Sequence, residues 1–295
     1  MKTLVIAGAS GFIGSHLIEH AAILGWNVKT IGRDRADATW NDQPSLMRVL
    51  EGADAVINLA GKSVNCRFTA DNIEALIRSR VDTTQAIGDA IALCKQPPKT
   101  WINASGASIY PENVSEPNTE DSAIDGAGVM ADVARQWENA LYTMHLPATR
   151  RIALRITLVL GKDGGVFPIY KRLVSLGQGG AQGTGKQWVS WIHVTDLTRL
   201  LFFLLENDSI SGPVNAAAPE PLPNQAFMAT LRKAMKFPFG IPAPALLIRM
   251  GTAVIGADSE LILRGMRVVS VKSPKHGFLF DYPTADAAFA ALLLK

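Results

Sequence analysis

The chain has 295 residues, 48% of them hydrophobic, and its 29 Lys and Arg nearly balance its 26 Asp and Glu. This length can bury a large core in one or two domains, and the charge balance argues against nucleic acid or an acidic membrane as partner, which leaves a small molecule. Cys66 and Cys94 suit neither a zinc cluster nor a disulfide framework, so we expect no metal and a cytoplasmic location. The composition specifies no oligomeric state.

Apolar runs and helical spacing alternate through the first half of the chain. They predict strands at 2–7, 28–31, 53–59, 100–104 and 152–160, and helices at 11–24, 44–52, 71–94 and 127–144. Such alternation is typical of a parallel sheet whose two faces are covered by helices. The sequence therefore predicts an α/β fold, a Rossmann-like doubly wound parallel sheet, over residues 1–165.

The remaining residues, 166–295, are predicted to form a smaller α-rich substrate lobe. A glycine-rich segment, 177–187, replaces the earlier alternation, and it could be either an anion-binding wrap or a flexible hairpin. Strands at 188–192 and 214–216 are expected to return to the first sheet.

One apolar stretch, 197–205, is about half as long as a bilayer-crossing helix at about 1.5 Å per residue. It predicts a buried helix, and no membrane partner is expected.

A glycine-rich loop connects the first predicted strand to the first helix. Glycines three residues apart at this crossing let backbone N–H groups and the helix N-terminus face a pyrophosphate. The loop therefore predicts a dinucleotide site made by Gly8, Ser10, Gly11, Phe12, Ile13 and Gly14.

The end of the second strand distinguishes the two nicotinamide dinucleotides. Sites that prefer NAD place a carboxylate there, about 20 residues after the glycines, to bind the ribose 2′-hydroxyl. This chain has Gly32 and Arg33, and a guanidinium pairs well with a 2′-phosphate, which predicts NADP(H). Asp34 leaves an alternative, in which Arg33 or Arg35 belongs to a surface ion-pair cluster.

Small residues end the next strand, at Leu59, Ala60 and Gly61. Strand ends in a doubly wound sheet face the ligand crevice, so these residues are predicted to contact the adenosine half of the cofactor. An ordinary turn is the alternative.

The motifs together resemble the epimerase/dehydratase branch of the extended short-chain dehydrogenase/reductases, and within it the epimerase-like subgroup labelled nucleoside-diphosphate-sugar epimerase or cell-division-inhibitor homologue. Besides the glycine loop, the resemblance is carried across nearly the whole chain by Asn58 to Gly61, Ser79-Arg80, Trp137-Glu138, Ser190 to His193 with Asp196, and Gly277-Phe278. It implies NADP binding, and it suggests Arg80 as a further cofactor contact. Arg80 could also be a solvated helix charge.

The proton donor of the wider superfamily is missing. Its redox enzymes use a Tyr followed four residues later by Lys, whereas no tyrosine of this chain has a lysine at that position. Alignment on Trp137-Glu138 puts Met130 and Ala134 there, and neither side chain donates a proton at neutral pH. The protein is therefore expected to reduce simple ketones very poorly.

Replacement donors are sought in the loop after the strand 100–104. Either Ser105 or Ser108 could align with the superfamily's serine, and Ser105 is the predicted one. A small residue that only ends the strand is the alternative. Tyr110 is the nearest phenol, with an ordinary pKa of about 10. His193 and Asp196 are interpreted as a structural imidazole and a helix N-cap.

Two functions remain open. The first is an NADP(H)-dependent oxidoreductase or epimerase for a small polar substrate, nucleotide-linked ones included. The second is an NADP(H)-binding protein without turnover that has a regulatory or partner-binding role. Nucleic-acid binding is disfavoured because no basic stripe with interleaved aromatics occurs.

Overall fold

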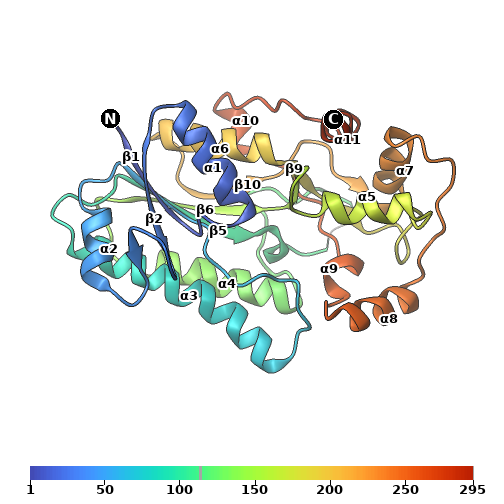
Figure 1. The fold of residues 1–295 in the computed structure, drawn as a ribbon, viewed down its shortest axis with the longest axis horizontal. Coiled ribbons are helices and arrows are strands. Elements are labelled where there is room, and N and C mark those ends of the chain that lie inside the picture. Colours follow the sequence, from blue (N-terminus) through green and yellow to red (C-terminus); the bar gives the residue numbers. More distant parts are fainter. Residues whose placement is uncertain (113–114, 295) are drawn as a thin grey trace.

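A computed structural model describes residues 1–112 and 115–294. Its centre is a seven-stranded sheet in the order β10-β6-β5-β4-β1-β2-β3, with all neighbours parallel (Figure 1). The strands are β1 (Thr3–Ala7), β2 (Asn27–Gly32), β3 (Ala38–Thr39), β4 (Ala55–Asn58), β5 (Thr100–Gly106), β6 (Arg150–Ile156) and β10 (Gly212–Ala216). The predicted doubly wound parallel sheet is confirmed, and its order reverses between β1 and β4, which is where such sheets bind ligands.

Helices cover both faces of this sheet. One face carries α1 (Phe12–Ile23) and α6 (Val194–Glu206), which pack together through apolar residues such as Leu17 and Leu201. The other face carries α2 (Gln43–Leu50), α3 (Ala70–Leu93) and α4 (Val129–Tyr142). The apolar stretch 197–205 lies within α6, so the predicted buried helix is confirmed.

Thr157 interrupts the strand that we predicted over 152–160. Both its N–H and its hydroxyl bind the carbonyl of Ala216, at 3.2 and 2.7 Å, and the chain then leaves the main sheet. The next strand, β7 (Leu158–Leu160), pairs with β9 (Trp191–His193), while β8 (Trp188–Val189) pairs with β11 (Leu222–Pro223). The expected return of 188–192 to the first sheet is therefore wrong, whereas the return of 214–216 as part of β10 is confirmed.

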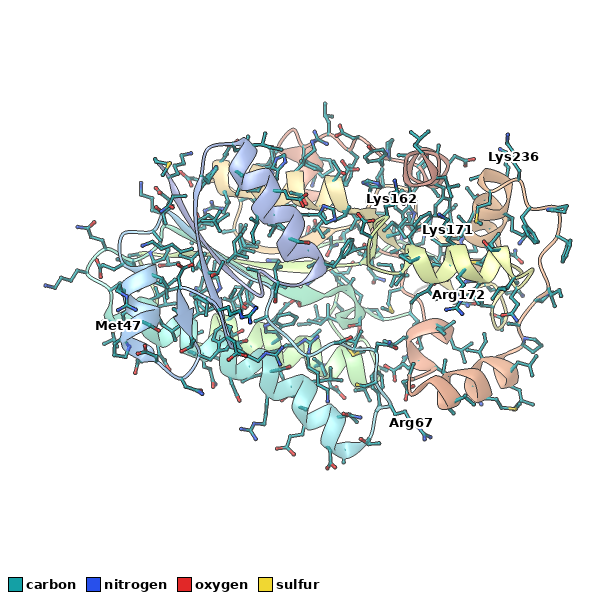
Figure 2. All side chains as sticks on the ribbon, viewed as in Figure 1. Met47, Arg67, Lys162, Lys171, Arg172 and Lys236 are labelled. Carbon is teal, nitrogen blue, oxygen red and sulfur yellow. The ribbon has the colours of Figure 1, made fainter. Side chains whose placement is uncertain are left out.

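A second hydrophobic core lies beside the sheet, around Phe167, Phe227 and Phe289. It is built from α5 (Phe167–Ser175), α7 (Asn224–Ala234) and α11 (Ala285–Leu293), with α8 (Ala245–Ile255) and α9 (Glu260–Leu263) below them in Figure 1, whereas the short α10 (Lys272–Lys275) contacts β10. Figure 2 places Lys171, Arg172 and Lys236 at this end of the molecule, where all three are exposed. A domain boundary at residue 165 stays a prediction.

The glycine-rich segment 177–187 is not a free hairpin. Its N–H groups at Gly180 and Gly183 donate to the carbonyls of Ile241 and Ala243, at 3.2 and 2.8 Å. The segment is therefore held against residues 241–243. None of the helices in residues 1–112 and 115–294 combines the length and the apolarity needed to cross a membrane.

Candidate functional site

The loop between β1 and α1 needs glycine at two places. Gly8 has φ +79°, and a Cβ there would lie 2.9 Å from the carbonyl carbon of Leu59. A Cβ on Gly14 would lie 2.5 Å from the carbonyl oxygen of Gly8. The loop therefore packs closely on the end of β4 and on the first turn of α1, because no side chain separates the backbones.

The N-terminus of α1 is open. Its N-cap, Gly11, makes no side-chain cap hydrogen bond, and the helix has no acidic residue in its first turn. The first N–H groups of a helix have no partner within the helix and attract anions. Since the carboxyl end of β1 points to this position, the loop and helix form a cradle that fits a pyrophosphate.

Arg33 follows directly after the last residue of β2, and its side chain is exposed. Within the described residues neither Arg33 nor Arg35 makes an ion pair. The surface cluster that Asp34 suggested is therefore not formed there, and the guanidinium is available to a ligand.

Arg80 is a buried cation. It is 8% exposed, donates from Nη1 to the Leu76 carbonyl and from Nη2 to the Lys62 carbonyl, and lies 5.0 Å above the ring of Trp137. Burial lowers the pKa of this guanidinium to about 10. The alternative of a solvated helix charge is wrong, and Arg80 instead fixes the turn after Gly61.

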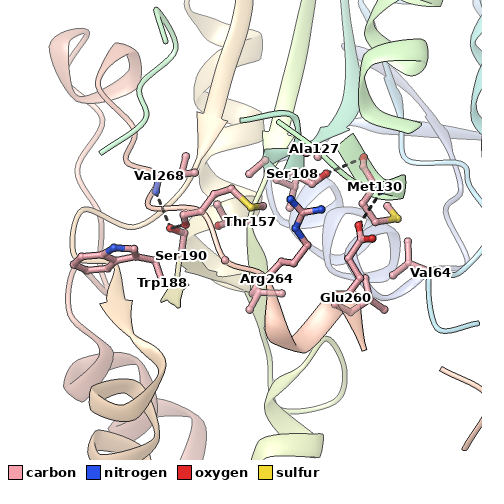
Figure 3. Close-up of a pocket in the computed structure, with 17 residues that line it drawn as sticks. Val64, Ser108, Ala127, Met130, Thr157, Trp188, Ser190, Glu260, Arg264 and Val268 are labelled. Atoms are coloured by element: carbon pink, nitrogen blue, oxygen red, sulfur yellow. Dashed lines mark hydrogen bonds between the residues drawn. The ribbon is translucent and has the colours of Figure 1, made fainter. Parts of the chain in front are cut away.

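Two adjoining pockets open at the carboxyl ends of β5 and β6. The larger has a volume of about 250 Å³ and lies between these strand ends and residues 188–190 and 260–268 of the second lobe (Figure 3). The smaller, of about 180 Å³, is lined by Arg80 and Trp137, and both pockets share Val64, Gly106, Ser108 and Met130. The larger pocket is therefore bounded by both parts of the molecule.

Met130 and Ala134 both line the smaller pocket. The two positions predicted to correspond to the superfamily's Tyr and Lys therefore face a cavity in this protein. Because both side chains are apolar, the cavity wall offers no proton where the superfamily has its acid.

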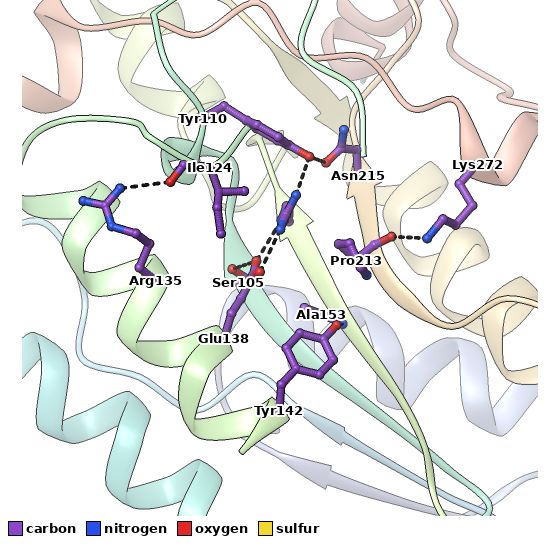
Figure 4. A network of polar contacts seen from close by, with 11 residues as sticks. Ser105, Tyr110, Ile124, Arg135, Glu138, Tyr142, Ala153, Pro213, Asn215 and Lys272 are labelled. Atoms are coloured by element: carbon purple, nitrogen blue, oxygen red, sulfur yellow. Dashed lines mark hydrogen bonds and ion pairs between the residues drawn. The ribbon is translucent and has the colours of Figure 1, made fainter. Parts of the chain in front are cut away.

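Two serines that line the smaller pocket, Ser105 and Ser108, donate their hydroxyl protons to acceptors of the protein itself. Ser105 is 4% exposed and donates at 2.7 Å to Oε1 of Glu138, and Arg155 binds the same carboxylate at 2.8 Å with Nε and with Nη2 (Figure 4). Ser108 donates at 2.9 Å to the carbonyl of Met130. Each hydroxyl is thus left with acceptor capacity toward a pocket ligand.

Tyr110 lies away from both pockets. It is 1% exposed, donates at 2.8 Å to Oδ1 of Asn215 and accepts at 2.7 Å from Nη1 of Arg155. Burial raises the pKa of its phenol. The geometry therefore argues against the predicted proton donor and gives Tyr110 a structural place in the network of Figure 4.

The start of α6 corrects one interpretation. The N-cap is His193, whose Nδ1 accepts from the N–H of Thr195 at 3.2 Å, and not Asp196. Asp196 is fully buried, where it accepts from the N–H groups of Asp281 and Tyr282 and pairs with Arg199. His193 is a structural imidazole, as predicted, and Asp196 ties the second lobe to α6.

Replacing His193 with Asn should weaken the loss of stability in acid. Burial, with a smaller effect of His16, lowers the pKa of His193 from 6.5 to about 4. Below about pH 6.5 the unfolded chain binds a proton at His193, whereas the native state does not bind it until the pH nears 4. The free energy of unfolding therefore falls as the pH drops from 6.5 toward 4. Asn keeps an N-cap acceptor and removes the titration.

Urea denaturation of both proteins between pH 7 and 4.5 checks this expectation. Equal pH dependence in wild type and His193→Asn would contradict it.

Several site residues were not recognised from the sequence. Arg155 had a usable signal, because an arginine inside a doubly buried apolar strand needs a partner. Ser108 was considered only as an alternative to Ser105. Glu260 and Arg264 reach the pocket from the second lobe, and no local pattern indicates that position.

The comparisons with known proteins agree with this architecture. The model of the family described as "NAD dependent epimerase/dehydratase family" matches residues 4–217. Epimerase family protein YfhF of Bacillus subtilis is 30% identical to this chain, over 98% of this chain and 97% of its own. An epimerase family protein of Staphylococcus aureus is 32% identical, with 100% of both chains covered.

Solved structures give the same result. The human epimerase family protein SDR39U1, whose crystal contains NADPH, matches with a TM-score of 0.90 at 28% identity, covering 98% of both chains. A nucleoside-diphosphate sugar epimerase from Corynebacterium glutamicum matches with a TM-score of 0.77 at 29% identity, covering 99% of this chain and 58% of that one. This chain therefore belongs to the NAD dependent epimerase/dehydratase family, within the extended short-chain dehydrogenase/reductases.

Proposed function

We propose that the protein binds NADP(H) and that its function is an oxidoreductase reaction or an epimerisation without the usual tyrosine acid. The observation that carries this proposal is the cradle formed by the Gly8 to Gly14 loop, the open N-terminus of α1 and the unpaired Arg33. The NADPH in the crystal of the human relative supports the choice of cofactor.

Different residues of the chain would bind different parts of the cofactor. The loop N–H groups and the α1 N-terminus would hold the pyrophosphate, Arg33 the 2′-phosphate, and Leu59 to Gly61 the adenosine half. Arg80 would support the turn at Gly61 that meets the cofactor, because its guanidinium carbon lies 3.1 Å from where a Cβ of Gly61 would stand. Bound NADPH supplies a hydride, and the chain must supply or replace the acid.

A binding protein without turnover is the second candidate. It is favoured by one observation, namely that the pocket wall carries the apolar Met130 and Ala134, at the predicted dyad positions, while Ser105 and Ser108 donate their protons to protein acceptors. General acid catalysis typically contributes about a hundred- to ten-thousandfold in rate, so its loss leaves little turnover of simple ketones.

Arg33→Ala should remove the preference for NADP(H). We expect the wild type to bind NADPH at least about tenfold more tightly than NADH, roughly 1.4 kcal/mol, because Arg33 meets the 2′-phosphate and Gly32 offers no competing carboxylate. The variant should bind both cofactors about equally. Calorimetric titration with the two reduced cofactors measures each affinity.

Arg48→Ala serves as the control, because Arg48 is an exposed arginine on α2 and should not affect the preference. A wild type with equal affinities, or an Arg33→Ala variant that keeps its preference, would show that the end of β2 does not read the 2′-phosphate.

One assay distinguishes the two candidate functions. Protein loaded with NADPH is incubated with a carbonyl library while the nicotinamide absorbance is followed. Time-dependent loss of absorbance supports the enzyme, and no loss with any compound supports the binding protein. A cytoplasmic location stays a prediction from cysteine usage.

A further inference from the structure

The larger pocket is lined mainly by apolar side chains and by strand-end backbone. Met130, Ile156, Leu158, Leu261 and Met266 supply much of this lining, and Trp188 adds an aromatic wall. A volume of about 250 Å³ lies just below the roughly 300–1,000 Å³ of sites for drug-sized ligands, so its occupant is small. Apolar walls favour a hydrocarbon body over a sugar, whose hydroxyls would lose hydrogen bonds with water.

The hydroxyl groups of the lining have their protons engaged. Thr157 donates to the Ala216 carbonyl, and Ser190 donates to the Met266 carbonyl while accepting from the N–H of Val268. Ser108 donates to Met130, as described above. Hydroxyl donors for a polyhydroxylated ligand are therefore scarce in this pocket.

Arg264 is the cation among the described residues that line the pocket. Its Nε pairs with Glu112, and within the described residues neither Nη atom has a hydrogen-bond partner. Figure 3 shows the side chain pointing into the pocket toward Ser108 on the opposite wall. The guanidinium is thus oriented by one carboxylate while it offers free N–H donors to a ligand.

The local charge opposes an anionic ligand. Glu112 already pairs with Arg264, and Glu260, whose carboxylate accepts from the N–H groups at the start of α4, also lines the pocket. Among the described residues, Arg264 and Glu260 are the charged ones of this lining, and Glu112 already pairs with Arg264, so the lining offers an anion no uncompensated cation. This disfavours a carboxylate and disfavours a diphosphate more strongly. A neutral acceptor can use the free N–H groups without this penalty.

The glycine-rich segment does not supply an anion cradle in compensation. The N–H of Gln182 donates to Oδ1 of Asn224 at 2.8 Å, and the N–H groups of Gly180 and Gly183 donate to the neighbouring strap, 241–243. A Cβ at Gly180 would lie 2.4 Å from the carbonyl carbon of Ile241, so no ligand fits between them. The N–H groups of Gly180, Gln182 and Gly183 are therefore engaged within the protein and are not available to a diphosphate.

We propose that the larger pocket binds a small, uncharged and mainly apolar carbonyl compound, and that Arg264 donates a hydrogen bond to its carbonyl oxygen. The proposal deepens the proposed function, on which it rests for the hydride, by naming the substrate class in place of a polar or nucleotide-linked one. Ligand binding by the pocket does not depend on the cofactor assignment.

Benzylacetone and hydrocinnamate make a matched test, because they differ only in a methyl ketone against a carboxylate. Calorimetric titration of the full chain, with and without NADPH, should give at least about tenfold tighter binding of the ketone. UDP-glucose should give no heat at the same concentrations. Tighter binding of hydrocinnamate or UDP-glucose would overturn the proposal, and so would the absence of any ketone binding to NADPH-loaded protein.

Arg264→Met removes the donors and keeps an apolar stem. It should weaken benzylacetone binding about tenfold, the value of a hydrogen bond from a charged donor, and leave NADPH affinity unchanged. Arg249→Met, an exposed arginine on α8, is the matched control. Unchanged ketone affinity in Arg264→Met would overturn the proposal, and the ketone–carboxylate comparison on wild type decides it if this variant fails to fold. Ketone binding without any NADPH binding would instead overturn the proposed function alone.

Discussion

Gly11→Val should lose NADPH affinity by at least about a hundredfold, roughly 2.7 kcal/mol, while keeping its fold. Gly11 has φ −79° and ψ 168°, extended backbone that valine adopts without strain. Apart from its two chain neighbours, the described atom within 4 Å of a Cβ at this position is the carbonyl oxygen of Gly8, at 3.3 Å. The branched side chain therefore extends into the mouth of the cradle, where the pyrophosphate must approach the backbone. Calorimetry measures the affinity and circular dichroism the fold.

Gly251→Val is the matched control, because it makes the same chemical change at an exposed position on α8 with nothing within 4 Å. Its NADPH affinity should equal that of wild type. A folded Gly11→Val protein with unchanged affinity would mean that the loop is only a turn. Gly14→Val is unsuitable as a probe, because its Cβ would collide with the Gly8 carbonyl and destabilise the fold itself.

The parallel sheet could be predicted from the sequence because its strands and helices differ in period. Apolar runs such as 2–7 and helical spacing such as 71–94 correspond to β1 and α3 within a few residues. The break at Thr157 could not be predicted, since Leu158 to Leu160 continue the apolar run of β6. Only the pairing with β9, which lies far along the chain, determines where β6 ends.

Some residues of the candidate site could likewise be predicted from the local sequence, and others could not. The glycine loop is local, so spacing and position were enough to predict its turn. The burial of Arg80 could be predicted in part from the sequence, because Arg80 follows Leu76 and precedes Thr84 at four-residue intervals on the buried face of α3. The engagement of Ser105 and the burial of Tyr110 depend on Arg155, which approaches from another strand. Contacts of this kind are set by strand order and are invisible in the local sequence.

The network around Arg155 holds four elements together. Its guanidinium contacts Glu138 on α4 and Tyr110 after β5, and Tyr110 extends the contact to Asn215 on β10. The side chains of Arg155 and Glu138 are only 4% and 8% exposed. Removing one partner would leave the other charge buried and unpaired, which is costly in a protein interior. The network therefore fixes the wall that carries Ser105.

Arg155→Met should lower the free energy of unfolding by about 3–5 kcal/mol, because the Glu138 carboxylate loses its bidentate cation and Tyr110 loses a donor. The double variant Arg155→Met/Glu138→Leu should recover much of this loss, since neither charge of the pair then remains buried without its partner. Arg78→Met is the matched control, as its ion pairs with Glu74 and Asp82 are 56–69% exposed and worth at most about 1 kcal/mol. Urea denaturation measures all three. A loss in Arg155→Met no larger than in Arg78→Met, or no recovery in the double variant, would show that the buried pair is not what holds this wall.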